Sequence, residues 1–182
     1  MSLRRRLKLV IALAIAAMPQ AAFARDEQAW DKASTIGRDG LVVAALGIPA
    51  VQGDWKGDLQ AGASVASAAL VTMGLKDVFP EWRPDHSNRR SFPSRHTSIS
   101  CAAAASLQNR YGWKVGLPAQ LVAAFVGVAR IEARKHQWYD VVAGAAIGET
   151  SGFLLTSKRD SAVRVLPWGD TKSAGLAMDV HF

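Results

Sequence analysis

The amino-acid sequence predicts a compact all-α bundle of about five helices, with an N-terminal signal segment before it and a short β-hairpin or extended tail after it. The chain contains five apolar-rich segments. Three of the four connections between them contain proline or glycine, which is typical of turns, and the fourth is the basic pair Arg134-Lys135. Hydrophobic residues make up 49% of the 182 residues, and the mean hydropathy is +0.07. We therefore divide the chain into a signal segment (1–24), a helical domain (25–161) and a tail (162–182).

The first 24 residues have the form of a secretory signal peptide. Arg4, Arg5, Arg6 and Lys8 precede an apolar run, and the small-residue pattern Ala22-Phe23-Ala24 predicts cleavage after Ala24. Removing four basic residues and no acidic residue lowers the formal net charge from +7 to 7 − 4 = +3. The basic excess then gives no support for a nucleic-acid partner. The alternative is an uncleaved membrane anchor, for which the apolar run is short.

The five helices are expected in a simple order. The turn-rich segment 53–57 ends the first, and Lys76 falls in the last turn of the second, where a cation suits the helix dipole. Three prolines make the polar segment 79–93 a loop between the second and third helices. The predicted helices cover residues 34–51, 58–77, 94–108, 117–133 and 136–155.

The last predicted helix is rich in small residues, which favour close contacts with other helices. These residues are Ala143, Gly144, Ala145, Ala146 and Gly148.

Cys101 is the only cysteine, so no intramolecular disulfide can form. Three of the six tryptophans, Trp82, Trp113 and Trp138, fit either anchors at a membrane interface or ordinary packing.

The tail has a different pattern from the helical domain. Apolar residues in the segments around Val163–Val165 and Leu176–Val180 alternate with a period of two, and a turn-rich segment separates them. This pattern predicts a small hairpin or an extended tail.

Three short clusters between Lys76 and Asp140 carry the residues suited to chemistry. Together they hold cations, a hydroxyl, two imidazoles and a carboxylate, which suits a phosphoryl group. The planar guanidinium of arginine matches phosphate oxygens two at a time. The clusters are Lys76 with Arg83-Pro84, then Pro93-Ser94-Arg95-His96, and finally Arg130 with His136 and Asp140.

Spacing suggests how the polar groups would cooperate. If the chain is helical from His136 onward, His136 and Asp140 share one face, and the carboxylate can orient the imidazole. Ser94 precedes an alanine-rich helical run, whose N-terminus favours an anion. His96, in the first turn of that helix, is then placed to donate a proton to a leaving oxygen.

The clusters KDVFPEWRP, PSRH and ARIEARKHQWYD resemble the three signature motifs of the type 2 phosphatidic acid phosphatase superfamily, K-x6-RP, PSGH and SR-x5-H-x3-D. That family includes membrane lipid phosphatases, soluble bacterial acid phosphatases and vanadium haloperoxidases. Nine positions match at the family spacings: Lys76, Arg83, Pro84, Pro93, Ser94, His96, Arg130, His136 and Asp140.

The resemblance implies a role for each matched polar residue. His136 would be the nucleophile that forms a phosphohistidine, Asp140 would orient it, and His96 would be the general acid. The phosphate would be bound by Lys76, Arg83, Ser94, the backbone of Arg95, and Arg130. The resemblance implies no metal and no other cofactor, and a zinc site is disfavoured because the surrounding cations would repel a metal.

Two positions depart from the family pattern. Ala129 replaces a serine and leaves the adjacent Arg130 in place. Arg95 replaces the glycine of PSGH, and its bulk and charge matter more, because glycine lets the backbone approach a ligand closely. Arg95 would either bind substrate as an extra phosphate ligand or partly obstruct the pocket.

The sequence therefore predicts an exported, metal-independent histidine phosphatase that hydrolyses phosphomonoesters or pyrophosphates. Lipid phosphates are the favoured substrates, with a periplasmic location that could include association with the inner membrane. A soluble acid phosphatase acting on small phosphate esters is the main alternative. A vanadate-dependent haloperoxidase and an inactive phosphate-binding protein are weaker alternatives, and the oligomeric state is not predicted.

Overall fold

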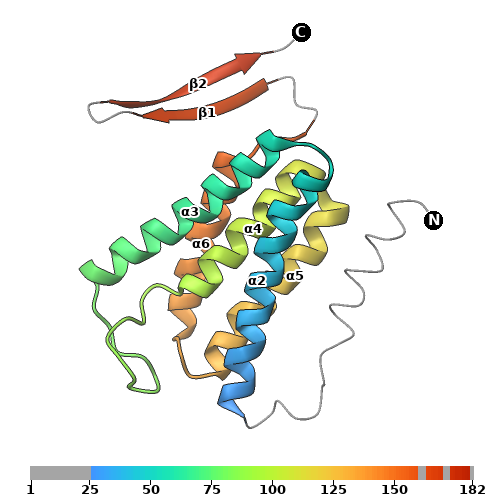
Figure 1. Cartoon of the computed structure of the whole chain (residues 1–182). Coiled ribbons are helices and arrows are strands. Elements are labelled where there is room, and N and C mark those ends of the chain that lie inside the picture. Colours follow the sequence, from blue (N-terminus) through green and yellow to red (C-terminus); the bar gives the residue numbers. More distant parts are fainter. Residues whose placement is uncertain (1–25, 160–162, 170–172, 181–182) are drawn as a thin grey trace, which may run out of the picture.

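The computed structural model describes residues 26–159, 163–169 and 173–180 (Figure 1). The all-α prediction is confirmed, because the helical domain consists of α2 (Glu27–Val51), α3 (Trp55–Val78), α4 (Arg95–Tyr111), α5 (Trp113–Glu132) and α6 (Trp138–Leu155). The predicted signal segment, residues 1–24, lies outside the described residues.

Helix α4 lies at the centre of the bundle and packs against the four other helices (Figure 1). Its middle turns consist of small residues, and residues 102–105 are all alanines with 0% exposure. Small side chains let neighbouring helices approach the α4 backbone from every side. The central position therefore follows from a sequence that has almost no bulky side chains to accommodate.

Helices α4 and α6 approach each other closely. A Cβ atom added at Gly144 would lie 2.5 Å from the carbonyl oxygen of Ser94, and one at Gly148 would lie 2.3 Å from that of Ser98. These two glycines are one helical turn apart and both face α4. The predicted close contacts of the small-residue helix are thus confirmed, and they position Ser94 directly against the first turns of α6.

Five helix ends meet at one end of the bundle, which we call the site end. Helices α2, α4 and α6 begin there, while α3 and α5 end there (Figure 1). The loop 79–94 and the connection 133–137 join these helices at the same end. Each of the three sequence clusters lies in or next to one of these two connections.

Of the helix boundaries that differ from the sequence prediction, two bear on the site. Helix α2 begins at Glu27 rather than Ser34, because the carboxylate of Asp26 caps it by accepting hydrogen bonds from the backbone amides of Gln28 and Ala29. Helix α6 begins at Trp138, so the prediction that His136 is helical is wrong. The imidazole and the Asp140 carboxylate therefore do not meet as neighbours on a helix face.

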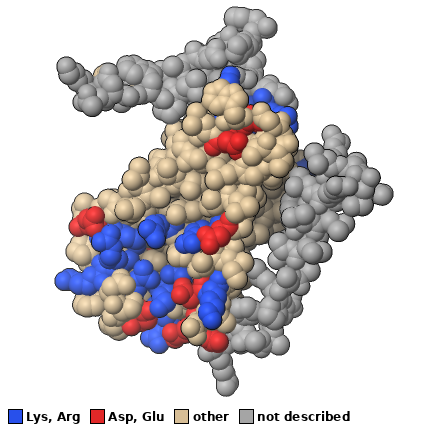
Figure 2. Space-filling model, viewed as in Figure 1, with Lys and Arg blue, Asp and Glu red and all other residues tan. Residues whose placement is uncertain are grey.

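Charged residues are absent from the middle of the bundle. The stretches 40–51, 59–75, 97–109, 115–129 and 141–148 contain no Asp, Glu, Lys or Arg. Figure 2 shows the charges gathered mainly at the site end, with an uncharged surface along the helices. Many large apolar side chains on this surface are exposed, including Ile36, Val43, Leu59, Leu70, Leu121, Val142 and Leu154.

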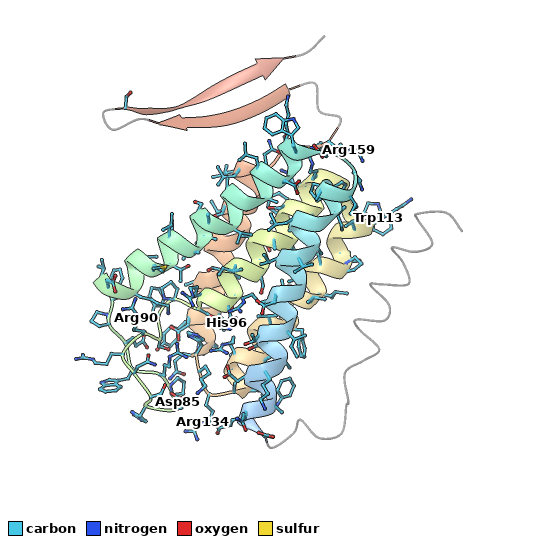
Figure 3. The ribbon with its side chains drawn as sticks, in the orientation of Figure 1. Asp85, Arg90, His96, Trp113, Arg134 and Arg159 are labelled. Atoms are coloured by element: carbon cyan, nitrogen blue, oxygen red, sulfur yellow. The ribbon has the colours of Figure 1, made fainter. Side chains whose placement is uncertain are left out.

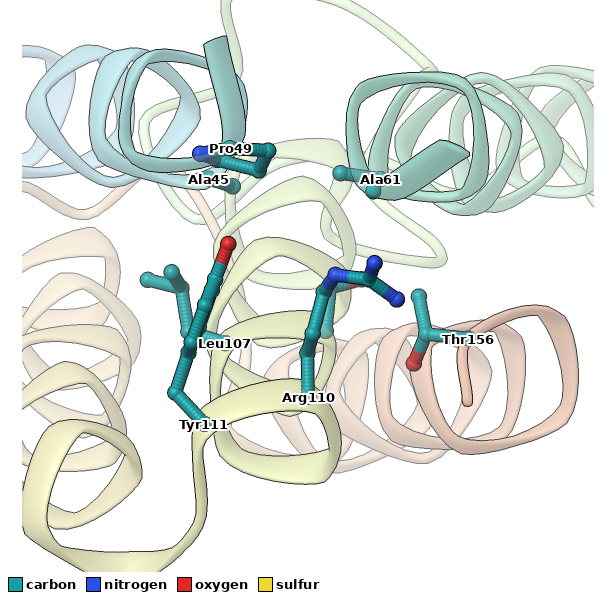
Figure 4. Close-up of a pocket in the computed structure, with 9 residues that line it drawn as sticks. Ala45, Pro49, Ala61, Leu107, Arg110, Tyr111 and Thr156 are labelled. Atoms are coloured by element: carbon teal, nitrogen blue, oxygen red, sulfur yellow. The ribbon is translucent and has the colours of Figure 1, made fainter. Parts of the chain in front are cut away.

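The end of the bundle opposite the site end, here called the far end, is held by a buried ion pair. Arg110 at the end of α4 pairs with Asp54, and their side chains are only 7% and 13% exposed. The Arg110 guanidinium also donates to Gln60 and to the backbone carbonyl of Ser157 at 3.0 and 3.1 Å. Figure 4 shows Arg110 and Tyr111 with the apolar residues around them. The pair thus ties the turn between α2 and α3 to the ends of α4 and α6.

The tail forms the predicted hairpin. Strands β1 (Val163–Gly169) and β2 (Ala174–Val180) pair antiparallel, with Val163 opposite Val180 and Gly169 opposite Ala174. The two-residue alternation in the sequence therefore corresponds to a two-stranded sheet outside the helical domain.

Candidate active site

The site end brings the three sequence clusters together. Lys76 comes from the last turn of α3, His96 from the first turn of α4, and Arg130 from the last turn of α5. His136 lies in the connection before α6, and Asp140 lies in the first turn of that helix. Figure 3 shows His96 near the start of α4, with Asp85 and Arg134 at the same end of the molecule.

Lys76 is buried and holds the loop that precedes α4. Its Nζ donates to the backbone carbonyls of Arg90, Ser91 and Pro93 at 2.7, 2.9 and 2.6 Å. The side chain is 7% exposed. Burial and the positive charge of Arg83 lower its pKa to about 8, although Asp140 acts in the opposite direction. Lys76 thus fixes the loop around the site and brings positive charge to it.

Arg83 lies in a loop that is tied to the connection before α6. Its Nε donates to Asn88 Oδ1 at 3.0 Å. Two residues further on, Asp85 accepts a 2.6 Å hydrogen bond from Lys135 Nζ, and its own backbone amide donates to the carbonyl of Arg134 at 3.1 Å. Burial raises the pKa of Asp85, but the hydrogen bonds from Lys135 and Ser87 and the charge of Lys135 together lower it below its usual value. The first and third clusters are therefore linked through these loops.

Ser94 and Arg95 stand at the start of α4. Ser94 is fully buried and caps the helix, its Oγ accepting from the backbone amide and the hydroxyl of Thr97 at 3.5 and 2.9 Å. Arg95 is the first residue of α4, and it is exposed. Its guanidinium has no hydrogen bond or ion pair within the described part of the chain. The replacement of the family glycine therefore adds an exposed cation at the edge of the site.

His96 contacts α2, which carries none of the sequence motifs. Its Nε2 lies 2.9 Å from Arg38 Nη1 and 3.4 Å from Thr35 Oγ1. A guanidinium can only donate, so Nε2 accepts and the neutral ring carries its proton on Nδ1. Burial, followed by the charges of Arg130 and Arg38, lowers the pKa of His96 to about 2.

Arg130 is also held by α2. Its Nη1 pairs with Asp31 and donates to Ser34 Oγ at 3.1 Å, and only 3% of the side chain is exposed. Its backbone carbonyl accepts from the amides of Lys135 and His136 at 3.1 and 3.3 Å. The guanidinium is thus fixed by one helix while its backbone positions His136.

His136 is buried beside Asp140. The imidazole is 2% exposed, and its Nδ1 lies 3.5 Å from Asp140 Oδ2, at the edge of hydrogen-bonding distance. Oδ2 accepts shorter bonds from Ser91 Oγ at 2.5 Å and from the amide of Gln137 at 2.9 Å. The carboxylate reaches His136 because it bends back over the N-terminus of α6, and not through helical spacing.

Burial and three nearby cations set the protonation of His136. Burial is the largest effect and lowers its pKa to about 4, against the opposing pull of Asp140. The charges of Arg130, Arg83 and Lys76 contribute to this lowered value. At neutral pH the imidazole is therefore uncharged, with one ring nitrogen free to act as a nucleophile or hydrogen-bond acceptor.

Several residues in the site were missed by the motif analysis. Asp31, Ser34, Thr35 and Arg38 come from α2, and Ser91 comes from the loop before α4. The α2 residues follow the helical spacing of three to four, so a polar stripe in an apolar helix was the available signal. Within the described residues, no group of three or more His, Cys, Asp or Glu side chains could hold a metal ion.

Comparison with known protein families agrees with the three motifs. The sequence model of the PAP2 superfamily, the type 2 phosphatidic acid phosphatases, matches residues 58–164, more than half of the chain. The chain belongs to this superfamily. It is therefore a member of a family of phosphatases, and α2 lies outside the matched segment.

Two relatives of this PAP2 chain are lipid A phosphatases. A lipid A 1-phosphatase of Porphyromonas gingivalis is 35% identical over 88 residues, which cover 47% of this chain and 20% of the relative. A lipid A 4'-phosphatase of Helicobacter pylori is 30% identical over 113 residues, which cover 56% of each protein. The chain thus spans about half or less of the length of these relatives.

A solved structure shares the fold. The transmembrane PAP2-type phosphatidylglycerolphosphate phosphatase of Bacillus subtilis superposes with a TM-score of 0.59 at 19% identity. The match covers 84% of this chain and 83% of that one. At this level of identity the similarity supports the helical arrangement of the superfamily.

Proposed function

We propose that this protein is an exported, membrane-associated phosphatase that hydrolyses lipid phosphates through a phosphohistidine on His136. The observation that carries the proposal is the convergence at the site end of a buried neutral imidazole, its carboxylate neighbour and several cations. A phosphoryl group in transfer needs positive charge around its equatorial oxygens and a nucleophile in line with the leaving oxygen. The residues gathered at the site end supply both.

In the first half of the reaction, Nε2 of His136 attacks phosphorus and the bond to the leaving oxygen breaks. Asp140 stabilises the positive imidazole that results, and His96 gives its proton to the leaving oxygen. The phosphoryl oxygens are bound by Arg83, Arg130, Ser94 and the backbone of residue 95. Lys76 adds its positive charge from behind, because its three N–H groups are already donated to the carbonyls of the loop. In the second half, water attacks phosphorus, the P–N bond breaks, and the proton of the water returns to His96.

His96 must be protonated before it can act as the acid. In the free site its low pKa results from burial and from the cations around it. A bound phosphate brings up to two negative charges, which offset those cations and raise the affinity of the ring for a proton. Substrate binding therefore prepares His96 for proton transfer.

The exposed apolar surface supports a membrane location. Helices α2 and α5 are long and apolar enough to cross a membrane. The 20 residues of α5 extend about 30 Å at 1.5 Å per residue, the thickness of a bilayer core. Trp82 and Trp138 are exposed at the site end, and Trp55 and Trp113 at the far end. Tryptophans at two levels fit the two membrane interfaces.

This surface favours lipid phosphates over small soluble esters as substrates. A site at the edge of an apolar belt can bind a headgroup while the acyl chains remain in the lipid. Charged loops at the site end fit the outer, periplasmic side if the predicted signal segment directs export. The two lipid A phosphatase relatives support the same substrate class.

The decisive experiment uses the full-length chain in mild detergent with a short-chain phosphatidic acid and p-nitrophenyl phosphate. We expect His136→Ala to lower phosphate release by at least about a thousandfold and to abolish acid-labile ³²P labelling of the protein. His86→Asn is the control, because asparagine tolerates the positive φ of 55° at that exposed position. Turnover by His136→Ala close to that of the wild type would disprove the mechanism. A preference for p-nitrophenyl phosphate would favour the soluble-ester alternative.

A further inference from the structure

Two arginines beside His96 are not needed for the scissile phosphate. Arg38 lies 2.9 Å from His96 Nε2, and Arg95 is the neighbour of His96 at the start of α4. The proposed function places other groups around the phosphoryl oxygens, from the loop before α4 and from α5. The arginine pair therefore adds positive charge on the side of the site where His96 acts.

Arg38 is a cation that the superfamily motifs do not include. It belongs to α2, outside the matched segment 58–164, and its side chain is 20% exposed. Its Nε and Nη2 both contact Asp39 Oδ1, at 2.8 and 2.7 Å, and Asp39 is itself 58% exposed. The exposed carboxylate screens Arg38 only weakly, since exposed ion pairs contribute little.

Arg95 is the stronger indication of an anionic ligand. Most other cations at the site end have an acidic partner, as Arg90 has in Asp77, Arg134 in Glu27 and Lys135 in Asp85. The guanidinium of Arg95 has neither an ion pair nor a hydrogen bond within the described part of the chain, although its charge acts on Lys76, Arg83 and His96. An exposed arginine among like charges is held at an electrostatic cost that an anion would remove.

The position beside the general acid identifies which part of the substrate would meet these cations. A general acid lies at the oxygen of the leaving group, so groups next to His96 contact the leaving group and not the transferred phosphoryl. We propose that Arg38 and Arg95 form a second anion-binding subsite beside His96, which takes a phosphoryl group carried by the leaving group of the substrate. The inference rests on the proposed function, because it depends on His96 being the acid.

The subsite also connects substrate choice to proton transfer. Arg38 donates to the same nitrogen of His96 that would need a free lone pair to accept a proton. A phosphoryl oxygen bound by Arg38 would draw the guanidinium away from that nitrogen. A substrate with a second phosphoryl group therefore both binds more tightly and frees His96 to be protonated.

The test compares substrates with and without a second phosphoryl group in the leaving group. Farnesyl diphosphate is paired with farnesyl monophosphate, and short-chain phosphatidylglycerol phosphate with phosphatidic acid, using the full-length chain in detergent. The wild type is expected to show a higher kcat/KM for the doubly phosphorylated member of at least one pair. The pair that shows the preference identifies whether the second group is a diphosphate or a phosphodiester.

Arg95→Gly and Arg38→Gln are each expected to lower that preference by about tenfold, the size of one charge-assisted hydrogen bond. Arg89→Gly is the matched control, because Arg89 is an exposed arginine that stacks on Trp82 in the loop before α4. The Arg89→Gly variant should prefer the doubly phosphorylated substrate as strongly as the wild type does. The pH dependence of kcat on the doubly phosphorylated substrate should also shift in Arg38→Gln, which a purely structural residue would not cause.

An unchanged preference in both variants, or equal kcat/KM for both members of each pair in the wild type, would overturn the subsite and leave the phosphatase intact. No turnover of any of the four substrates by the wild type would overturn the proposed function, and the subsite with it. Binding of methylenediphosphonate by His136→Ala gives a readout without turnover. Affinity equal to that for inorganic phosphate would overturn the subsite.

Discussion

The two ends of the helical bundle both contain buried charged side chains, but their charge balance differs. At the far end, the buried Arg110 has a buried carboxylate partner in Asp54 and further acceptors in Gln60 and Ser157. At the site end, the two buried cations, Lys76 and Arg130, outnumber the one buried carboxylate of the described residues, Asp140. The exposed Arg95 has no acidic partner among the described residues either. An ion pair that is complete within the protein serves the fold, whereas an excess of one charge is suited to a ligand that supplies the other.

The largest effect is expected from breaking the far-end pair. Arg110→Met leaves the largely buried Asp54 carboxylate without its partner, which should lower the free energy of unfolding by about 3 kcal/mol. Thermal unfolding in detergent measures the loss, and turnover per folded molecule should stay at the wild-type level. The double variant Asp54→Asn with Arg110→Met should recover most of the stability. A double variant as unstable as the single one would contradict this explanation.

The next effect is a loss of stability in acid that originates at the site end. The pKa of His136 is about 4 in the folded protein and about 6.5 in an unfolded chain, so the unfolded state binds more protons between these values. Stability should therefore fall as the pH drops from about 6.5 to about 4, by on the order of 2–3 kcal/mol from this group. Between pH 7 and pH 4.5, the melting temperature should fall less for His136→Gln than for the wild type. An identical fall would show that His136 is not responsible.

The smallest effect is expected at Asp31, the carboxylate that pairs with Arg130 at the site end. Asp31→Asn keeps the size of the side chain but removes the ion pair with that guanidinium. We expect kcat to fall about tenfold because Arg130 loses its orientation, while KM does not rise because its positive charge remains. Glu27→Gln, which breaks an exposed pair on the same helix, is the control and should change neither constant. A rise in KM with unchanged kcat would contradict an orienting role for Asp31.

Much of the fold was predictable because local signals agreed with one another. Prolines marked the loop before α4, turn residues separated α2 from α3, and small residues indicated the contact between α4 and α6. The start of α2 was predicted too late because its cap, Asp26, follows directly on the predicted signal segment. The start of α6 was predicted too early because the helical spacing of His136 and Asp140 suggested a helix that begins at His136.

The candidate site was only partly predictable. The spacing of the motifs identified the residues that gather at the site end, but it contained no information about α2. Asp31 and Ser34 reach Arg130, and Arg38 reaches His96, through contacts between residues far apart in the sequence. Such contacts depend on how helices pack, which a local pattern does not specify. The burial that sets the pKa of His136 is likewise a property of the assembled bundle.

The glycines of α6 have a consequence for efforts to change the substrate range. Because a side chain at residue 144 would overlap the carbonyl oxygen of Ser94, no mutation there can enlarge the site without moving the residues that carry out the reaction. The loop 79–93 has no such restriction over much of its length, since residues 86–90 are exposed. A directed-evolution library should therefore keep the seam between α4 and α6 constant and place its diversity in residues 86–90 of that loop.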